Sequence, residues 1–117
     1  MQTLYWDLKN PRGYEAIEEA AKLIRNGEVV AFPTETVYGL GANGLDGAAI
    51  KKIFAAKGRP ADNPLILHIA DKKDIAALTS GLTANAEALL DTFWPGPLTM
   101  IVAKSSLIPD ETTAGLD

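Results

Sequence analysis

Two cations, Lys57 and Arg59, flank a single glycine, and two prolines stiffen the segment that follows them. A guanidinium offers a planar fork of donors and an ammonium offers a point charge, a pairing that suits phosphate oxygens. The amide of Asn63, between Asp62 and Pro64, can add a donor to the same ligand. The structural alternative is that the cations complement a helix dipole and that Asn63 caps its own turn. The two cations have no obvious carboxylate partner except Asp62, so an anionic ligand explains the arrangement better than a surface ion pair does.

A second polar segment lies upstream, at residues 32–41, and reads FPTETVYGLG. Thr34 and Thr36 alternate on an extended stretch, so both hydroxyl groups can face one cleft. Tyr38 would line that cleft or its rim. The structural alternative is that these threonines simply favour a strand and that Glu35 is a solvated acid. No nearby carboxylate pairs with Glu35 for acid–base chemistry.

His68 is the one histidine of the chain, and it lies among aliphatic residues in a predicted strand. A single histidine in a strand is commonly a structural residue with satisfied hydrogen bonds. Strand alternation places it opposite the face that carries Leu65, Leu67 and Ile69. This position, away from the main apolar face, favours a place in the cleft.

Several other kinds of site are disfavoured by the sequence. Residues 39–44 match G-x-G-x-x-G, but residues 33–38 separate them from the preceding strand and the next helix starts beyond the third glycine, which argues against NAD binding. The chain has no cysteine, which excludes disulfides, thiolate metal sites and a cysteine nucleophile. One histidine and no H-E-x-x-H motif argue against zinc. No P-loop motif is present.

Composition is that of an ordinary globular protein, with 117 residues, 47% hydrophobic and 22% charged. The net charge of −4 provides no global basic field for nucleic acid. The N-terminus lacks the features of a signal peptide, and no apolar run reaches membrane-spanning length. We therefore predict one domain at most, in a cytoplasmic protein.

Alternating helices and strands predict an α/β fold that must position these side chains. Asp46 is expected to cap a helix through Lys57, with an inward stripe at Ala49, Ile50, Ile53 and Phe54. We expect Asn10 to start the first helix, Gly39 and Gly41 to keep their segment irregular, and the tail from Ser105 to be loop-like. The predicted helices are residues 14–26, 46–57, 71–78 and 83–93, the last with Ala86, Leu89, Leu90 and Phe93 inward. The predicted strands are residues 3–8, 28–32, 64–70 and 98–103.

Three segments, FPTETVYGLGAN, KGRPADNPLILHI and FWPGPLTMIV, occur in an order and spacing that closely resemble the YrdC-like threonylcarbamoyl-AMP synthase family. The resemblance runs from about Tyr14 to the last residue. Lys57-Gly58-Arg59 supplies the K-x-R half of the family signature, while the downstream S-x-N half is absent from the 117 residues. Residues 1–117 are therefore expected to be the N-terminal portion of a single YrdC-like domain, and inactive by themselves.

The resemblance implies an open, twisted, mixed α/β sheet with flanking helices and a concave cleft. It implies an enzyme that condenses L-threonine, bicarbonate and ATP into threonylcarbamoyl-AMP and pyrophosphate. Partner proteins would then transfer the threonylcarbamoyl group to adenosine 37 of tRNA. Mg²⁺ would accompany the ATP phosphates, held by phosphate and water rather than by protein ligands.

The family pattern also implies roles for individual residues. Thr36 and His68 would contact the threonine, and Arg59 and Asn63 would contact ATP. Lys57 would join Arg59 as a catalytic cation. Two further side chains would line the cleft: Thr34 and Tyr38.

Two alternatives stay open from the sequence. The first is a double-stranded RNA-binding module of the same fold, which the acidic net charge makes less attractive. The second is the carbamoyl-adenylate-forming carbamoyltransferase domain of hydrogenase maturation. Proteins of that type carry zinc-binding cysteines and an acylphosphatase-like region, and this chain has no cysteine.

Overall fold

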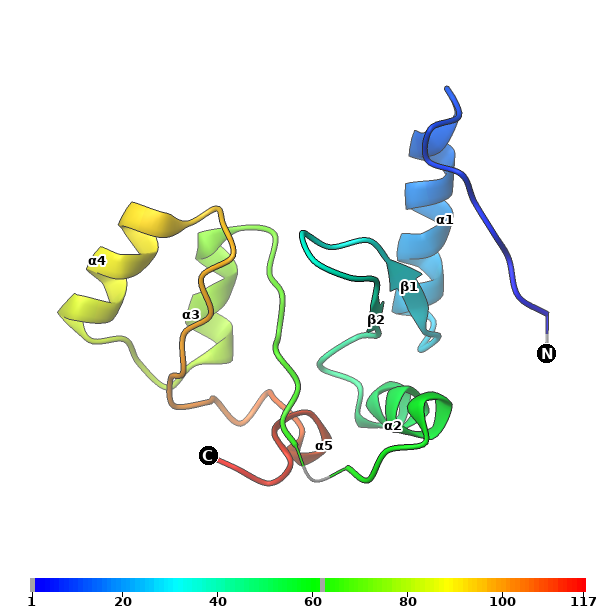
Figure 1. Cartoon of the computed structure of the whole chain (residues 1–117). Helices are drawn as coiled ribbons and strands as arrows, with labels where there is room; N and C mark the ends of the chain where they lie inside the picture. Colours follow the sequence, from blue (N-terminus) through cyan, green and yellow to red (C-terminus); the bar gives the residue numbers. More distant parts are fainter. Residues whose placement is uncertain (1, 62) are drawn as a thin grey trace. The chain divides into compact units, whose positions relative to one another are not determined.

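The computed structural model describes residues 2–61 and 63–117. The first predicted helix is formed as α1, Gly13–Arg25 (Figure 1). The prediction that Asn10 starts this helix was wrong, because Arg12 takes the N-cap position. Asn10 instead builds the turn before the helix, where its side chain accepts from the Arg12 N–H at 3.1 Å. Helix α1 is followed by Gly27 with φ +80°, a left-handed conformation that commonly ends helices.

A two-stranded antiparallel sheet follows, made of β1, Val30–Phe32, and β2, Gly39–Gly41. The expectation that this glycine segment is irregular was wrong. Phe32 lies opposite Gly39, and its ring also covers Gly41, where an added Cβ would stand 2.6 Å from the ring. Glycine is a poor strand former in isolation, but here its missing side chain leaves room for the aromatic ring. The ring therefore explains why glycines can form β2.

Helix α2, Gly47–Lys57, confirms the second predicted helix most fully. The Asp46 carboxylate accepts from two backbone N–H groups of the first turn, at 3.0 and 3.2 Å, which is the predicted cap. Gly58 ends the helix in the left-handed conformation, with φ +64°. The buried residues of the helix are those of the predicted stripe: Ala49, Ile50, Ile53 and Phe54.

The chain forms two compact units, Met1–Gly58 and Arg59–Asp117. The first unit holds α1, β1, β2 and α2. The second unit holds short helices and long segments without regular secondary structure (Figure 1). The class is therefore mixed α/β, as predicted from the alternation of elements.

In the second unit, the predicted helix at residues 71–78 is formed as a 3₁₀ turn, η1, Lys72–Asp74, continued by α3, Ile75–Leu78. Asp71 accepts from the Lys73 N–H at 3.0 Å and so caps this element. The last predicted helix is α4, Ala84–Phe93. Its N-cap is Thr83, whose hydroxyl accepts a backbone N–H at 3.1 Å.

The predicted inner face of α4 is only half correct. Ala86 and Leu90 are buried, whereas Leu89 is 43% and Phe93 is 56% exposed. Residues four apart lie in one row along a helix, so the buried contact follows a single row and leaves the neighbouring row uncovered. The predicted stripe was therefore too wide for the packing of this short helix.

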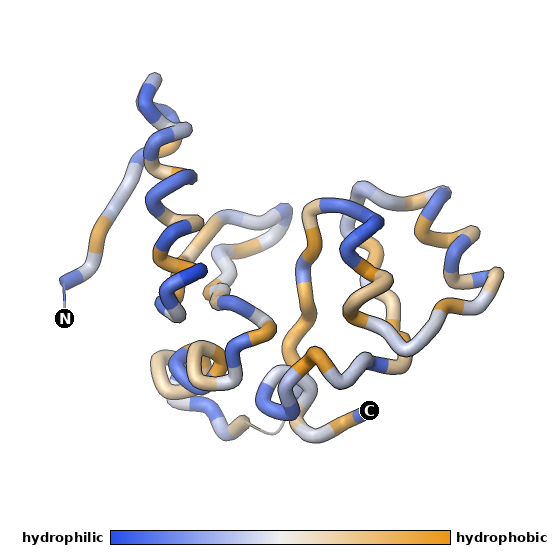
Figure 2. Tube along the Cα trace, turned by 180° about the vertical axis from the view of Figure 1, so that it is seen from behind, coloured by the Kyte–Doolittle hydropathy of each residue, from blue (hydrophilic) through white to orange (hydrophobic). Residues whose placement is uncertain are grey.

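The predicted strands at residues 3–8, 64–70 and 98–103 are not assigned as strands. Residues 64–70 and 98–103 nevertheless alternate between half-buried and exposed side chains, and Figure 2 shows 64–70 as a largely hydrophobic stretch. Their described backbone bonds are isolated: Leu65 donates to Thr112 O at 2.9 Å, and Ser80 donates to Ala103 O at 3.0 Å. A strand requires a neighbour that supplies successive ladder bonds, which an alternating sequence does not guarantee. The prediction of which side chains of residues 64–70 share a face was correct, but the prediction that these residues form a strand was wrong.

The tail, expected to be loop-like, contains one further short helix, α5, Asp110–Thr113. Its first turn carries two acidic residues, which complement the helix dipole. Ala114 and Gly115 then take positive φ, and the Gly115 N–H donates to Asp110 O at 3.0 Å. These local signals lie between Asp110 and Gly115 and explain why a polar tail forms a helical turn here.

Gly41→Ala tests the contact that allows β2 to form. The added methyl group meets the Phe32 ring, so we expect the free energy of unfolding to fall by about 1–3 kcal/mol, as in other overpacked sites. Gly39→Ala is the matched control, since its Cβ would lie 3.5 Å from the nearest atoms and should cost within about 0.5 kcal/mol. Thermal unfolding measures both, and equal melting temperatures would contradict the steric account.

Candidate functional site

The connection between β1 and β2 carries a cluster of hydroxyl groups centred on Thr34. The Thr34 hydroxyl accepts from the Thr36 N–H at 3.3 Å and lies 3.4 Å from the Thr36 hydroxyl oxygen. It also donates to Val37 O. Because its single hydrogen is directed to that carbonyl, Thr36 is the donor between the two hydroxyl groups. The Thr36 oxygen then keeps acceptor capacity for a ligand.

This loop is exposed along its length. Thr34 and Thr36 are exposed, and Tyr38 is 77% exposed next to the start of β2. An exposed tyrosine offers an apolar ring and a hydroxyl group, which suits the edge of a binding surface. The structure therefore presents Thr34, Thr36 and Tyr38 together on one short loop.

Lys57 is the last residue of α2, and Arg59 follows the left-handed Gly58. Both side chains are exposed. Among the described residues, neither side chain forms an ion pair. Asp62, the carboxylate partner considered from the sequence, lies outside the described residues.

Asn63 and His68 lie in the second unit and are both exposed. The His68 Nδ1 lies 3.2 Å from Ile66 O, so the tautomer with the proton on Nδ1 donates to this carbonyl. In that tautomer Nε2 is an acceptor. Residues 65, 67 and 69 are half-buried while residues 66 and 68 are exposed, which confirms the predicted facing of His68.

The candidate residues are thus divided between the two units. Thr34, Thr36, Tyr38 and Lys57 belong to the first unit, and the structure brings the first three onto one loop. Arg59, Asn63 and His68 belong to the second unit.

The described side chains of these candidates offer hydrogen-bond donors, acceptors and positive charge rather than metal ligands. No cluster of three or more histidine, cysteine or acidic side chains that suits a metal ion occurs among the described residues. In the part of the chain that the structure describes, no helix has both the length and the apolar character needed to cross a bilayer.

Sequence reasoning did not single out Lys52, whose Nζ donates to Gly27 O at 2.8 Å. The two residues are 25 positions apart. Helix periodicity places Lys52 beside the buried stripe of α2, but no local pattern identifies a backbone carbonyl as its partner.

A comparison with protein families matches residues 22–117 to the Sua5/YciO/YrdC family, described as "Telomere recombination". The chain belongs to this family. Two curated Sua5/YciO/YrdC relatives are named threonylcarbamoyl-AMP synthase: one from Pyrococcus abyssi, 56% identical over 108 residues, and one from Bacillus subtilis, 54% identical over 102 residues. The matches cover 88% and 86% of this chain but 32% and 30% of those proteins. The chain thus spans about a third of the length of these relatives.

Solved Sua5/YciO/YrdC structures confirm the fold. A structure of a P. abyssi Sua5 variant matches 99% of this chain and 36% of its own length, with a TM-score of 0.93 and 51% identity. P. abyssi Sua5 complexed with L-threonine matches 86% of this chain and 30% of its own length, with a TM-score of 0.83 and 57% identity. The solution structure of MTH1692 from Methanobacterium thermoautotrophicum matches with a TM-score of 0.68 at 30% identity, covering 99% of this chain and 54% of that protein.

Thr34→Val tests whether the Thr34 hydroxyl orders this Sua5/YciO/YrdC loop. The substitution removes the acceptor of the Thr36 N–H, so hydrogen exchange at the Thr36 amide should become several-fold faster. Thr34→Ser keeps the hydroxyl group and should retain slow exchange. Amide exchange followed by NMR measures both, and unchanged protection in Thr34→Val would mean that the loop is ordered by other contacts.

Proposed function

We propose that this chain forms the N-terminal portion of a single-domain L-threonylcarbamoyladenylate synthase. The proposed reaction condenses L-threonine, bicarbonate and ATP into threonylcarbamoyl-AMP and pyrophosphate, in the cytoplasm. The product would serve formation of N6-threonylcarbamoyladenosine at position 37 of tRNA, through partner proteins that handle the tRNA. The observation that carries this proposal is the 57% identity, with a TM-score of 0.83, to a relative crystallised with L-threonine.

The proposed threonine contacts are Thr36 and His68. The Thr36 hydroxyl donates to Thr34, which leaves its oxygen as an acceptor for the ammonium or hydroxyl group of threonine. With the proton of His68 on Nδ1 toward Ile66 O, Nε2 accepts in the same way. Thr34 and Tyr38 would line the surface beside them.

The proposed ATP contacts are Arg59 and Asn63, with Lys57 as a second cation. The guanidinium of Arg59 can bind two phosphate oxygens at once, and the Lys57 ammonium can neutralise a third. The Asn63 amide can donate to a phosphate or accept from the base. All three side chains are exposed and therefore accessible to a nucleotide.

The reaction needs positioned charge more than a covalent catalyst. The threonine amine combines with bicarbonate to give a carbamate and water, and a carbamate oxygen then attacks the α-phosphorus of ATP. The new oxygen–phosphorus bond forms as the bond to pyrophosphate breaks, and negative charge grows on the leaving oxygens. Lys57 and Arg59 would stabilise this charge, which is the usual contribution of such donors.

Mg²⁺ fits this site as a companion of the nucleotide. Among the described residues, the candidate side chains are cations, hydroxyl groups and an amide, with no carboxylate cluster to form a cage. Mg²⁺ commonly keeps several waters and binds substrate phosphates, so bound metal would supply further neutralisation of phosphate charge.

Arg59→Ala and Lys57→Ala test the catalytic assignment. Each should lower threonine-dependent ATP–pyrophosphate exchange by about 10²–10³, the usual cost of one charged donor at a developing oxyanion. Both residues are exposed, so the melting temperature should stay close to that of the parent protein. Arg59→Lys should restore activity only partly, because the planar fork is lost.

The exchange assay is best made in a fusion of this chain to the remainder of the P. abyssi relative, which supplies the two thirds that the chain does not match. Lys73→Ala is the matched control, an exposed lysine of the second unit that is outside the proposed site. The 117-residue chain alone should give negligible pyrophosphate release. Normal exchange in Arg59→Ala, or early unfolding of it, would remove this residue from the catalytic role.

His68→Ala tests the threonine assignment separately from the ATP assignment. In the same fusion, threonine affinity should fall about five- to tenfold, the effect of one or two lost hydrogen bonds. ATP affinity should change less than twofold, since the proposed nucleotide contacts are retained. Isothermal titration with each substrate measures both. An equal loss for the two substrates, together with a lower melting temperature, would show that His68 is a structural residue.

A further inference from the structure

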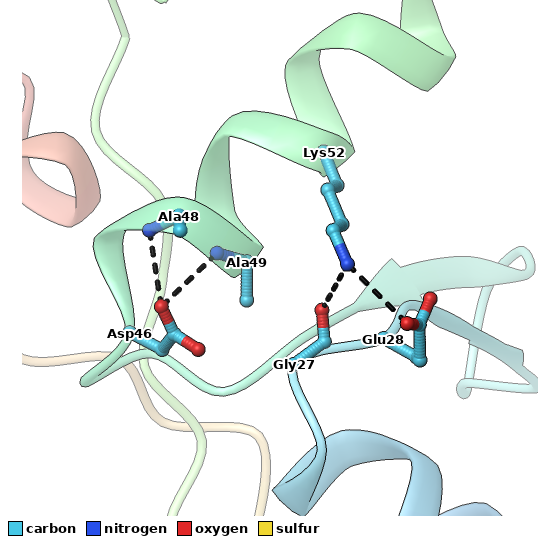
Figure 3. A network of polar contacts seen from close by, with 6 residues as sticks. All are labelled: Gly27, Glu28, Asp46, Ala48, Ala49 and Lys52. Atoms are coloured by element: carbon cyan, nitrogen blue, oxygen red, sulfur yellow. Dashed lines mark hydrogen bonds and ion pairs between the residues drawn. The ribbon is translucent and has the colours of Figure 1, made fainter.

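The side chain of Lys52 joins helix α2 to the turn that precedes β1 (Figure 3). Its Nζ donates to Gly27 O at 2.8 Å and lies 3.4 Å from Glu28 Oε1. Gly27 is the second residue after Arg25, where α1 ends, so the ammonium of Lys52 lies near the negative end of the helix dipole. Lys52 therefore brings both a donor and a positive charge to this end of α1.

Asp46 approaches the same turn from the first residue before α2. Its Oδ1 caps α2, while a Cβ built on Gly27 would lie only 3.2 Å from its Oδ2. Gly27 also has φ +80°, a conformation that residues with side chains rarely adopt. Figure 3 shows Asp46 and Lys52 reaching the Gly27 region from one helix. We call the two contacts of Lys52 with the Gly27–Glu28 turn the α2 clamp.

Two parts of the proposed site belong to the first unit: the Thr34–Tyr38 loop and Lys57. Both are connected along the chain to the α2 clamp. Three residues after Gly27 the chain enters β1, and β1 leads directly into the Thr34–Tyr38 loop. On the other side, Lys57 lies five residues beyond Lys52 in the same helix, about 7.5 Å along its axis. The hydrogen bonds of Thr34 within the loop reach only three residues along the chain. The clamp is therefore a direct polar link between the helix that carries Lys57 and the chain that leads into the loop.

We propose that Lys52 is a positioning residue for threonine binding, which fixes the Thr34–Tyr38 loop relative to helix α2 by holding the Gly27 carbonyl. The inference rests on the proposed function, because threonine is the ligand whose affinity reports the loop position. Lys52 contacts no reacting atom in this account. Its influence passes through Gly27 and β1 to the loop.

The two contacts of Lys52 contribute differently. The Lys52 and Glu28 side chains are 48% and 54% exposed, and ion pairs at such exposure contribute little. The Gly27 contact is shorter and joins a charged donor to a backbone carbonyl, so it is a charge-assisted hydrogen bond and the stronger of the two contacts. Removing the Glu28 charge should therefore leave the loop in place, whereas removing the Lys52 ammonium should not.

The test uses the 117-residue chain, with L-threonine as the probe and ¹⁵N-resolved NMR as the readout. Lys52→Met should shift the amide resonances of residues 34–38 before threonine is added, and should raise the threonine Kd about five- to tenfold, the effect of one lost charge-assisted hydrogen bond. Lys52→Arg keeps the charge and donors and should restore Kd to within about threefold of the parent chain. Lys52→Gln, which keeps a neutral donor, should fall between them.

Two matched controls separate positioning from general charge loss. Glu28→Gln removes only the weaker contact, and Lys22→Met removes an exposed lysine of α1 that pairs with Glu19 at 3.1 Å. Both should keep Kd within about twofold, as expected for exposed ion pairs.

The failure of this inference differs from that of the proposed function. If the parent chain shows no threonine-dependent shifts, the threonine assignment of the chain is wrong and Lys52 loses its proposed role with it. If the parent chain binds threonine but Lys52→Met binds equally well, or leaves the resonances of residues 34–38 unchanged, only the positioning role is overturned. If Lys52→Met does not fold, Lys52→Gln decides. If Lys52→Arg loses as much threonine affinity as Lys52→Met, the packing of the lysine side chain matters rather than its hydrogen-bond donor.

Discussion

The approach of the Phe32 ring to Gly41 is the contact on which the first unit depends. The ring occupies the space that a Cβ at position 41 would need, so glycine at this position favours the pairing of β2 with β1. The resulting register, with Phe32 opposite Gly39, closes residues 33–38 into a short loop. That loop carries the Thr34 and Thr36 hydroxyl pair. A packing constraint in the strands thereby determines where the polar groups lie.

The polar groups that follow from this arrangement suit binding and charge neutralisation rather than nucleophilic attack. The loop offers hydroxyl groups and the end of α2 offers Lys57, while Arg59 and His68 belong to the second unit. Adenylate formation by a carbamate has the same requirement, since both reactants are anionic and the chemistry proceeds once they are aligned. The α2 clamp adds a means of keeping one cation and the hydroxyl loop in a constant relation within the first unit.

The parts of the fold that the sequence predicted well depend on local signals. Helix α2 and its buried stripe follow from Asp46, from the apolar spacing and from a left-handed Gly58, all within thirteen residues. Strand β2 was missed because its stability comes from an aromatic ring in another strand. Residues 64–70 alternate as predicted, but a ladder partner is a non-local feature that alternation does not reveal. The candidate site residues were predicted from residue types and from motif resemblance, whereas the contact between Lys52 and the Gly27 carbonyl spans 25 positions and left no local signal.

The central claim is that this chain binds L-threonine through the β1–β2 loop and His68. An isotope-filtered NMR experiment tests it most directly, with unlabelled L-threonine and ¹³C-labelled chain, by detecting nuclear Overhauser contacts from the ligand methyl group. The account predicts contacts to the side chain of Thr36 and to the ring of His68, and their loss when D-threonine replaces L-threonine. Contacts confined to other residues, or equal contacts from the D-enantiomer, would contradict it.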